Sequence, residues 1–249
     1  TIRIQDLPEA FDGLRIAHVS DTHHGPYVSL RYIEEIVARV NEEAPDLVAL
    51  TGDYVHRTRR AIEPGIGAFA GFDARYGAVA VLGNHEHWED ADACRGVLKR
   101  IGVPLLDNRR RVLTPDGWRD TAENEPALCI GGVGDLWEDT TDFNAALRGI
   151  PRNVPRLVLA HNPDAAEAIA PPYRVDLMLA GHTHGGQVRF PVMGAPATPS
   201  RYGDKYAGGL CQGPRCPVVV SRGLGLAGIP VRFGVPPEIG MITLRRTRA

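Results

Sequence analysis

The chain has 249 residues, of which 43% are hydrophobic and 23% charged, and its formal net charge is -2. This composition is that of an ordinary globular protein and excludes disordered and collagen-like chains. The near-neutral charge provides no strong basic field, so we expect no stable complex with nucleic acid. A chain of this length buries a large core unaided, so any bound metal is expected to serve function rather than to hold the fold together.

The sequence contains no apolar run of about 18 residues, the length that spans a bilayer. No signal peptide is visible. Because the first residue is Thr1 rather than Met, the sequence leaves open whether an N-terminal signal or anchor was removed. The expected location is therefore cytoplasmic, or exported or peripheral to a membrane if such a segment was removed. The basic run Arg109–Arg111 predicts a solvated surface, with a contact to phospholipid head groups as the alternative.

Four cysteines are present, and none has the surroundings of a zinc site. Cys129 lies in an apolar, strand-like run and predicts a buried thiol. Cys211 and Cys216 are close enough in sequence for a local disulfide, which would indicate an oxidising compartment. The sequence leaves that pairing open, and it does not indicate an oligomeric state.

The first half of the chain alternates predicted strands with predicted helices. Ser29 is suited to cap a helix in which apolar residues recur at helical spacing, and Pro45 stops that helix. The predicted strands of this half are 14–20, 46–51 and 78–82, and the predicted helices are 30–40, 62–74 and 89–101.

The second half repeats the pattern with fewer helices. The polar segment 108–126 predicts a hairpin or a surface excursion, and 191–200 and 207–217 predict loops. No internal repeat or linker is visible, so a single domain over residues 1–249 is the simplest prediction. The predicted strands of this half are 127–133, 156–160, 176–180, 217–220 and 241–244.

The predicted strands are continuously apolar rather than alternating. Strands that are buried on both faces, as in a parallel sheet covered by helices, have this pattern. Polar residues gather just after the carboxyl ends of these runs. Open α/β sheets bind their ligands at that edge, so the sequence predicts a site there.

Five of the nine histidines directly follow a predicted strand, each in a short polar cluster. A single histidine in such a position is more often structural, but several strand ends with the same chemistry indicate a common site. Asp21, Asp53 and Asn84 share that position. The five histidines are His23, His85, His161, His182 and His184.

These residue types suit a pair of divalent metals. Carboxylate, amide oxygen and imidazole favour manganese, iron or zinc. Two metals in one site clamp a phosphoryl group and activate water, and a carboxylate can bridge them. Asp21 and His23 are two residues apart, as are His182 and His184, so in an extended backbone both members of a pair would point the same way. Nearby glycines allow tight turns beside the metals; these are Gly52, Gly83, Gly181, Gly185 and Gly186.

This ordered set of motifs resembles the calcineurin-like metallophosphoesterase superfamily. The motifs are Asp21-Thr22-His23, Gly52-Asp53, Gly83-Asn84-His85-Glu86, His161 and Gly181-His182-Thr183-His184. The rest of the chain also resembles the bacterial YkuE/YaeI-like phosphodiesterase branch. The matching pieces are Leu7-Pro8, Phe11-Asp12-Gly13-Leu14, Gly185-Gly186-Gln187, Tyr202-Gly203, Tyr206-Ala207-Gly208-Gly209, Ser221-Arg222-Gly223 and Pro236-Pro237-Glu238-Ile239.

The resemblance implies an α/β fold, namely a four-layer α/β/β/α sandwich of two mixed sheets with a dinuclear metal site at the strand ends. It implies two divalent ions, with Mn²⁺ favoured and iron or zinc as alternatives. His85 would act as general acid or would stabilise charge on the phosphoryl oxygens. Asp21, His23 and His184 would hold the first metal, Asn84, His161 and His182 the second, and Asp53 would bridge them.

The expected reaction is hydrolysis of a phosphodiester P–O bond by a metal-bridging hydroxide, with an imidazole protonating the leaving alkoxide. The substrate would be a small phosphoester or a phospholipid-like molecule, with peripheral membrane contact as a further expectation. One alternative is a phosphomonoesterase, which needs extra cations such as Arg189, Arg201, Lys205 or Arg222. A second alternative is a hydrolase of UDP-lipid pyrophosphate, and an apolar groove near the metals would support it. A nuclease and a non-catalytic scaffold complete the alternatives, and the intact ligand set disfavours the scaffold.

The sequence departs from the phosphoprotein phosphatase pattern at His56. Those relatives carry an aspartate there, which orients the catalytic histidine. We therefore do not expect protein-phosphatase activity, and the sequence does not identify the group that orients His85.

Overall fold

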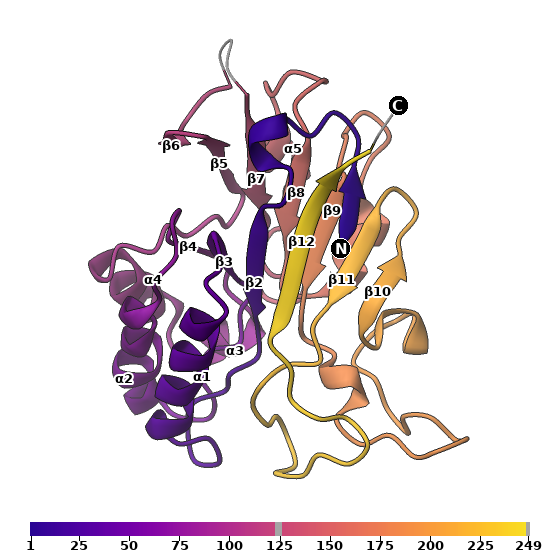
Figure 1. Cartoon of the computed structure of the whole chain (residues 1–249). Helices are drawn as coiled ribbons and strands as arrows, with labels where there is room; N and C mark the ends of the chain where they lie inside the picture. Colours follow the sequence, from indigo (N-terminus) through magenta and orange to yellow (C-terminus); the bar gives the residue numbers. More distant parts are fainter. Residues whose placement is uncertain (123–125, 248–249) are drawn as a thin grey trace.

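Two β-sheets lie face to face at the centre of the molecule in the computed structural model, which describes residues 1–122 and 126–247 (Figure 1). In the first sheet β2, β3 and β4 are parallel, and β12 runs antiparallel to β2. Its strands, in spatial order, are β1 (Ile2–Ile4), β12 (Gly240–Arg246), β2 (Arg15–Val19), β3 (Leu47–Leu50) and β4 (Ala78–Ala80).

The second sheet also mixes strand directions. Its four central strands are parallel, and antiparallel strands flank them on both sides. In spatial order they are β10 (Gly209–Gln212), β11 (Pro217–Val220), β9 (Leu177–Ala180), β8 (Arg156–Leu159), β7 (Leu128–Gly132), β5 (Arg109–Thr114) and β6 (Gly117–Arg119).

Helices cover the outer faces of both sheets. On the first sheet lie α1 (Leu30–Glu42), α2 (Ile62–Gly67) and α4 (Ala91–Arg100), and α3 (Asn84–Glu89) stands at the end of β4 (Figure 1). On the second sheet α5 (Phe143–Leu147) contacts β5 and β7, and the 3₁₀ helix η4 (Pro163–Ala168) contacts β9 and β11. The remaining 3₁₀ turns are Glu9–Phe11, Arg59–Ala61, Ala68–Gly71, His184–Gly186 and Gly203–Tyr206. This arrangement confirms the expected four-layer fold of two mixed sheets.

The burial of each central strand explains why its sequence is continuously apolar. In β3, Val48 and Leu50 pack under the helices, whereas Leu47 and Ala49 face the other sheet. In β9 the same alternation places Leu177 between the sheets. Both faces are therefore removed from water, and the hydrophobic effect requires apolar residues at every position.

Helix α1 forms as its sequence predicts. The Ser29 hydroxyl accepts a hydrogen bond from the Tyr32 backbone N–H at 3.2 Å, which caps the first turn. Four apolar side chains at helical spacing are buried against the sheet, and the helix ends two residues before Ala44-Pro45. The buried residues are Ile33, Ile36, Val37 and Val40.

Several predicted boundaries were wrong. The helix expected over 62–74 ends as a 3₁₀ turn at Gly71. The helix expected over 89–101 begins only at Ala91 and ends at Arg100, because Asp90 adopts an extended backbone and its carboxylate caps α4 by accepting the Ala93 N–H at 2.9 Å. The expected loop 207–217 contains strand β10, a half-exposed edge strand whose flanking glycines and prolines hid it.

The polar segment 108–126 contains the expected hairpin, formed by β5 and β6; its residues 123–125 lie outside the described part of the chain. Strand β1 was not expected, because its three residues are too few for a periodic signal. Cys211 and Cys216 are free thiols, with Cys211 facing Val218 across the β10–β11 pair, and the predicted burial of Cys129 is confirmed. Among the described residues, no helix has the length and apolarity needed to cross a membrane.

Candidate metal centre

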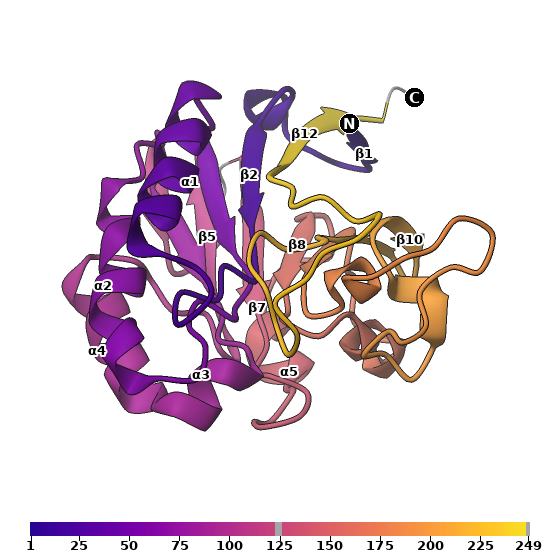
Figure 2. The same ribbon diagram turned by 90° about the horizontal axis from the view of Figure 1, so that it is seen from below.

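The carboxyl ends of five strands, drawn from both sheets, meet at one end of the molecule, which faces the viewer in Figure 2. The structure brings together at this end every residue that the sequence predicted as a ligand. Asp21 and His23 follow β2, Asp53 follows β3, Asn84 and His85 begin α3 after β4, His161 follows β8, and His182 and His184 follow β9.

Two groups of three side chains each have the spacing of a cation site. In the first, the ligand atoms of Asp21, His23 and His184 lie within 4.8 Å of one another. His184 Nε2 is 2.9 Å from His23 Nε2 and 3.3 Å from Asp21 Oδ1. Imidazole nitrogens and a carboxylate oxygen thus converge on one point, as metal ligands do.

The second group consists of Asp53, His161 and His182, whose ligand atoms also lie within 4.8 Å of one another. His161 Nε2 is 3.2 Å from Asp53 Oδ2 and 3.1 Å from His182 Nδ1. The other ring nitrogen of His161, Nδ1, lies 2.8 Å from the Thr51 carbonyl oxygen. That contact fixes the ring and directs Nε2 to the site. A backbone carbonyl is a common partner for the second ring nitrogen of a metal-binding histidine.

The Asp53 carboxylate belongs to the second group and also lies close to His23 of the first group. Its Oδ2 atom is 3.2 Å from His161 Nε2 and 3.6 Å from His23 Nε2, and its Oδ1 atom accepts the backbone N–H of His85 at 3.0 Å. A carboxylate in this position can serve two cations at once.

Buried polar atoms without partners indicate that the groups fit a metal. Asn84 Oδ1, His182 Nε2 and His23 Nδ1 are buried and have no hydrogen-bond partner among the described residues. An unpaired buried polar atom costs about 1–3 kcal/mol. A cation held by Asn84 Oδ1 and by His182 Nδ1, the ring nitrogen that faces His161 Nε2, would satisfy the first of these three atoms.

The protonation states also suit cation binding. Burial alone raises the pKa of Asp53, but the charges of His161 and His85 bring it well below its ordinary value. Burial lowers the pKa of His182 to about 3 and that of His23 well below its ordinary value. Burial also lowers the pKa of His161, but the Asp53 carboxylate outweighs it and raises that pKa. A bound cation would take the place of the His161 proton.

The backbone is strained at most of these residues. Asp21, His23, Asp53, His182 and His184 have φ between 47° and 69°, in the left-handed region. Each such residue costs of order 1 kcal/mol or more and clusters of them occur at functional sites. The expectation that an extended backbone aligns the two pairs of ligands was therefore wrong, because tight left-handed turns direct these side chains to the site.

Glycines let the ligands approach the backbone closely. A Cβ atom at Gly83 would overlap Asp53 Oδ1, and one at Gly181 would overlap Ser20 Oγ and Asp21 Oδ2. Any larger residue at either position would displace a ligand carboxylate.

Glu86 holds two of the ligand-bearing loops together, a role that sequence reasoning missed. Its buried carboxylate accepts backbone N–H groups from Asp53 and Gly83 on Oε2, both at 2.8 Å, and from Tyr54 and Val55 on Oε1, at 2.7 and 3.2 Å. The signal was present, since a charged residue directly follows Asn84-His85 in the motif.

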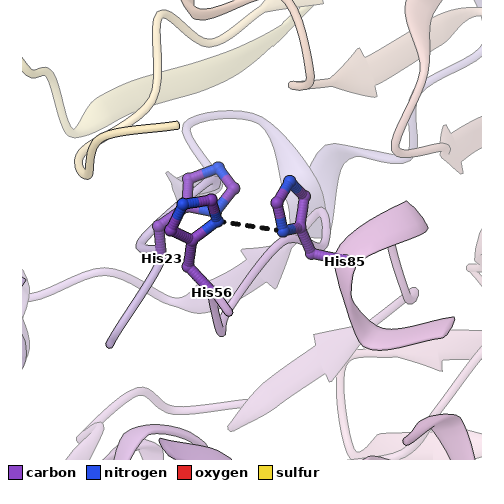
Figure 3. Close-up of side chains that lie close together, drawn as sticks. All are labelled: His23, His56 and His85. Carbon is purple, nitrogen blue, oxygen red and sulfur yellow. Dashed lines mark hydrogen bonds between the residues drawn. The ribbon is translucent and has the colours of Figure 1, made fainter. Parts of the chain in front are cut away.

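His56 is the group that contacts His85. The two Nδ1 atoms lie 3.1 Å apart and make the contact that is drawn as a dashed line in Figure 3, so one ring donates and the other accepts. Burial lowers the pKa of His56 to about 4, so this partner is neutral at pH 7. Because the ligand atoms of His23, His56 and His85 also lie within 4.8 Å of one another, this trio could hold a cation as well.

Two half-exposed tryptophans border the centre and were not predicted as site residues. The Trp88 ring centroid lies 4.6 Å from that of His85, and the Trp137 centroid lies 4.3 Å from that of His182. Trp88 Nε1 donates to Glu138 Oε1 at 2.8 Å. The rings give the mouth of the site flat apolar walls.

Comparison with known proteins shows that the chain is similar in sequence to phosphoesterases. The family described as calcineurin-like phosphoesterase matches residues 14–186. An uncharacterized metallophosphoesterase of Bacillus subtilis, YkuE, is 32% identical over 99% of this chain and 84% of its own length. The phosphodiesterase YaeI of Escherichia coli is 33% identical over 92% of this chain and 82% of its own length.

A transmembrane protein with a metallophosphoesterase domain from Danio rerio is 31% identical over 98% of this chain, which spans 56% of that relative. Among solved structures, the calcineurin-like phosphoesterase YfkN of Bacillus subtilis aligns with a TM-score of 0.46 at 16% identity, over 85% of this chain and 82% of that one.

We predict that Glu86→Gln weakens both the fold and metal binding. The amide nitrogen of glutamine cannot accept, so two backbone N–H groups lose their acceptor, at a cost of about 1–3 kcal/mol. Because the loops that carry Asp53 and Asn84 would then move, Mn²⁺ binding should weaken by roughly tenfold to a hundredfold. Urea unfolding with a chelator present and a Mn²⁺ titration measure the two effects. Glu89→Gln, on the same helix, is the matched control, and equal behaviour of the two variants would contradict the role of Glu86.

Proposed function

Because the chain belongs to the calcineurin-like phosphoesterase family, we propose that this phosphoric ester hydrolase is a dinuclear metal-dependent phosphodiesterase. The observation that carries the proposal is the position of the Asp53 carboxylate, which belongs to one group of Asp and His ligands and also lies close to His23 of the other. Cation pairs of this kind clamp a phosphoryl group from both sides.

In this proposal Asp53 would contribute to the binding of both cations. When bound, the cations supply Lewis acidity and a nucleophilic hydroxide. We favour Mn²⁺, with iron or zinc as alternatives, because the donors are carboxylate, amide oxygen and imidazole. Asp21, His23 and His184 would hold the first ion, and Asn84, His161 and His182 the second.

His85 is the proposed proton donor to the leaving group. Its backbone N–H is fixed by Asp53 Oδ1, and its Nε2 atom lies 3.9 Å from Asp53 Oδ2, at the edge of the centre. His56 contacts the opposite ring nitrogen. The ring is therefore held with Nε2 directed to where a substrate oxygen would lie, the geometry required of a general acid.

The ion pairing of nearby cations favours a diester over a monoester. A monoester dianion calls for extra positive groups, but three of the four candidate cations are paired with acids, namely Arg189 with Asp204, Arg222 with Glu238 and Lys205 with Glu167, and only Arg201 has no ion pair among the described residues. The relative YaeI is named a phosphodiesterase, which also supports this choice.

The purified protein with Mn²⁺ should hydrolyse bis(p-nitrophenyl) phosphate, and Asp53→Asn should abolish most of that activity. Loss of a shared anionic ligand removes several kcal/mol of transition-state stabilisation, so kcat/KM should fall roughly a thousandfold. Asp73→Asn, an exposed aspartate far from the centre, is the control. Turnover of p-nitrophenyl phosphate alone would contradict the diesterase, and full activity of Asp53→Asn would contradict the dinuclear mechanism.

His56 is proposed as a positioning residue, and His56→Phe should lower kcat about tenfold to a hundredfold with little change in KM, because His85 loses its partner. His56→Asn, which keeps a hydrogen-bonding group, should restore most of kcat. The loss should be larger for a diester with an alkyl leaving group than for bis(p-nitrophenyl) phosphate, since an alkoxide needs the proton more.

Metal content separates this role from metal binding by His56. Elemental analysis of His56→Phe should give the parent's metal content. A lower content, or an equal loss of kcat on both diesters, would contradict the positioning role.

A lipid-linked substrate is the second candidate, favoured by an apolar cavity of about 420 Å³ that begins at the predicted ligand His184. Such a cavity would hold the aliphatic chain of a lipid phosphodiester or of a UDP-lipid pyrophosphate. Its other lining residues include Gln187, Val188, Pro196, Ala197, Ala227 and Ile229.

Filling this cavity should distinguish the two candidates. Ala227→Phe should raise KM for a long-chain alkyl p-nitrophenyl phosphodiester by about tenfold, because several buried methylene groups lose their place. The same variant should leave the kinetics on bis(p-nitrophenyl) phosphate unchanged. An unchanged KM for the long-chain substrate would contradict the lipid-linked candidate and leave the phosphodiesterase standing.

A further inference from the structure

Two neighbouring loops carry most of the large apolar side chains that the described residues expose to solvent. These loops, residues 188–203 and 223–237, are called the docking loops below. Val192 is fully exposed and Met193 is 78% exposed. The other exposed apolar side chains of the docking loops are Phe190, Tyr202, Ile229, Val231 and Phe233. Apolar side chains gathered on one surface mark an interaction site.

The docking loops are fixed to each other and to the metal centre. The Arg189 N–H donates to the Phe233 carbonyl at 2.7 Å, and the Phe233 N–H donates to the Gln187 carbonyl at 3.0 Å. The Gln187 side-chain amide donates to the Ile229 carbonyl at 2.7 Å. Arg232 Nη2 lies 3.2 Å from His184 Nδ1. The apolar side chains therefore form a preorganised surface next to the site.

This surface lies at the end of the molecule that holds the metal centre. In Figure 1 the docking loops, orange and yellow, extend below the ends of the strands. The apolar cavity that begins at His184 is lined by residues of both loops. A partner that covers the loops would therefore meet the mouth of the site.

The charged residues within the docking loops are all positive. Neither segment contains Asp or Glu, whereas they carry Arg189, Arg201 and Arg232, of which Arg232 is half-buried and donates to the carbonyls of Gly225 and Arg222 within the protein. Arg57 adds a further exposed cation, because its guanidinium donates to the Gly228 carbonyl at 3.3 Å. Arg189 is paired with Asp204 just outside the first segment. Apolar tips with basic flanks complement an anionic bilayer, in which acyl chains lie beneath negative head groups.

The fold gains nothing from the valine at the tip. Val192 has φ 73°, a conformation that is unfavourable for a β-branched residue, and it buries no surface. A glycine or an asparagine would suit this backbone better. An apolar side chain here stabilises only a complex with something outside the chain.

We propose that the docking loops insert their apolar tips into the surface of an anionic lipid bilayer and hold the metal centre against it. A symmetric pair of two copies is a poorer fit, because it would place the same arginines of both copies against each other. This docking does not depend on which phosphoester the site cleaves.

Vesicle flotation tests the proposal with the full chain. The protein should float with vesicles of phosphatidylcholine and phosphatidylglycerol, and far less with phosphatidylcholine alone. The double variant Val192→Asp with Met193→Asp should bind the anionic vesicles at least about tenfold more weakly, because two inserted apolar side chains are lost. Arg201→Ala should weaken binding about fivefold, and only on the anionic vesicles.

Leu210→Asp is the matched control, since Leu210 is 65% exposed but lies on strand β10, outside the docking loops. It should bind vesicles like the parent. All variants should keep the parent's activity on bis(p-nitrophenyl) phosphate, or the parent's unfolding midpoint if that substrate is not turned over.

Absence of flotation with either vesicle would overturn the proposal. Equal weakening by Leu210→Asp would show general adhesion and would also overturn it. A concentration-dependent dimer that the double variant abolishes, without vesicle binding, would assign the docking loops to a second copy instead.

Discussion

The site depends on one carboxylate, that of Asp53, being held where the two sheets meet. Its Oδ2 atom faces His161 from the second sheet and His23 from the first, and its Oδ1 atom fixes the start of α3 through the His85 N–H. Its own backbone N–H is held by Glu86. Movement of this carboxylate would therefore disturb both ligand groups and the histidine proposed as proton donor at the same time.

The arrangement is unfavourable for the chain alone. Five ligand residues have left-handed backbone, and Asn84 Oδ1 and His182 Nε2 are buried without partners among the described residues. Each feature costs of order 1 kcal/mol or more. The apolar layers on both sides of each sheet supply the stability that offsets these costs, and bound cations would add to it because they bind only the folded site. The rigidity of the sheets thus maintains a geometry that the loops would not adopt by themselves.

The sequence predicted the parts of the structure that depend on local pattern. Runs such as 46–51 and 156–160 are apolar throughout because both faces of a central strand are buried, and polar residues at their ends belong to one edge because parallel strands share it. Strand β10 escaped prediction because an edge strand is half-exposed and its identity comes from its partner β11. Glu86 and the contact between His56 and His85 also escaped, because four backbone N–H groups and a ring–ring contact come together only in three dimensions.

The contact of His85 with a second imidazole, that of His56, rather than with a carboxylate decides the chemistry available to His85. An aspartate beside an imidazole favours its protonated form and raises its pKa, whereas a neutral imidazole can accept a hydrogen bond without adding negative charge. Burial already lowers the pKa of His85, and His56 offers no charge to oppose that effect. The lowered pKa of His85 makes its protonated form a stronger acid, but the ring is protonated less often. Such a group suits a substrate whose own negative charge, together with Asp53, draws the proton to the ring as the substrate binds.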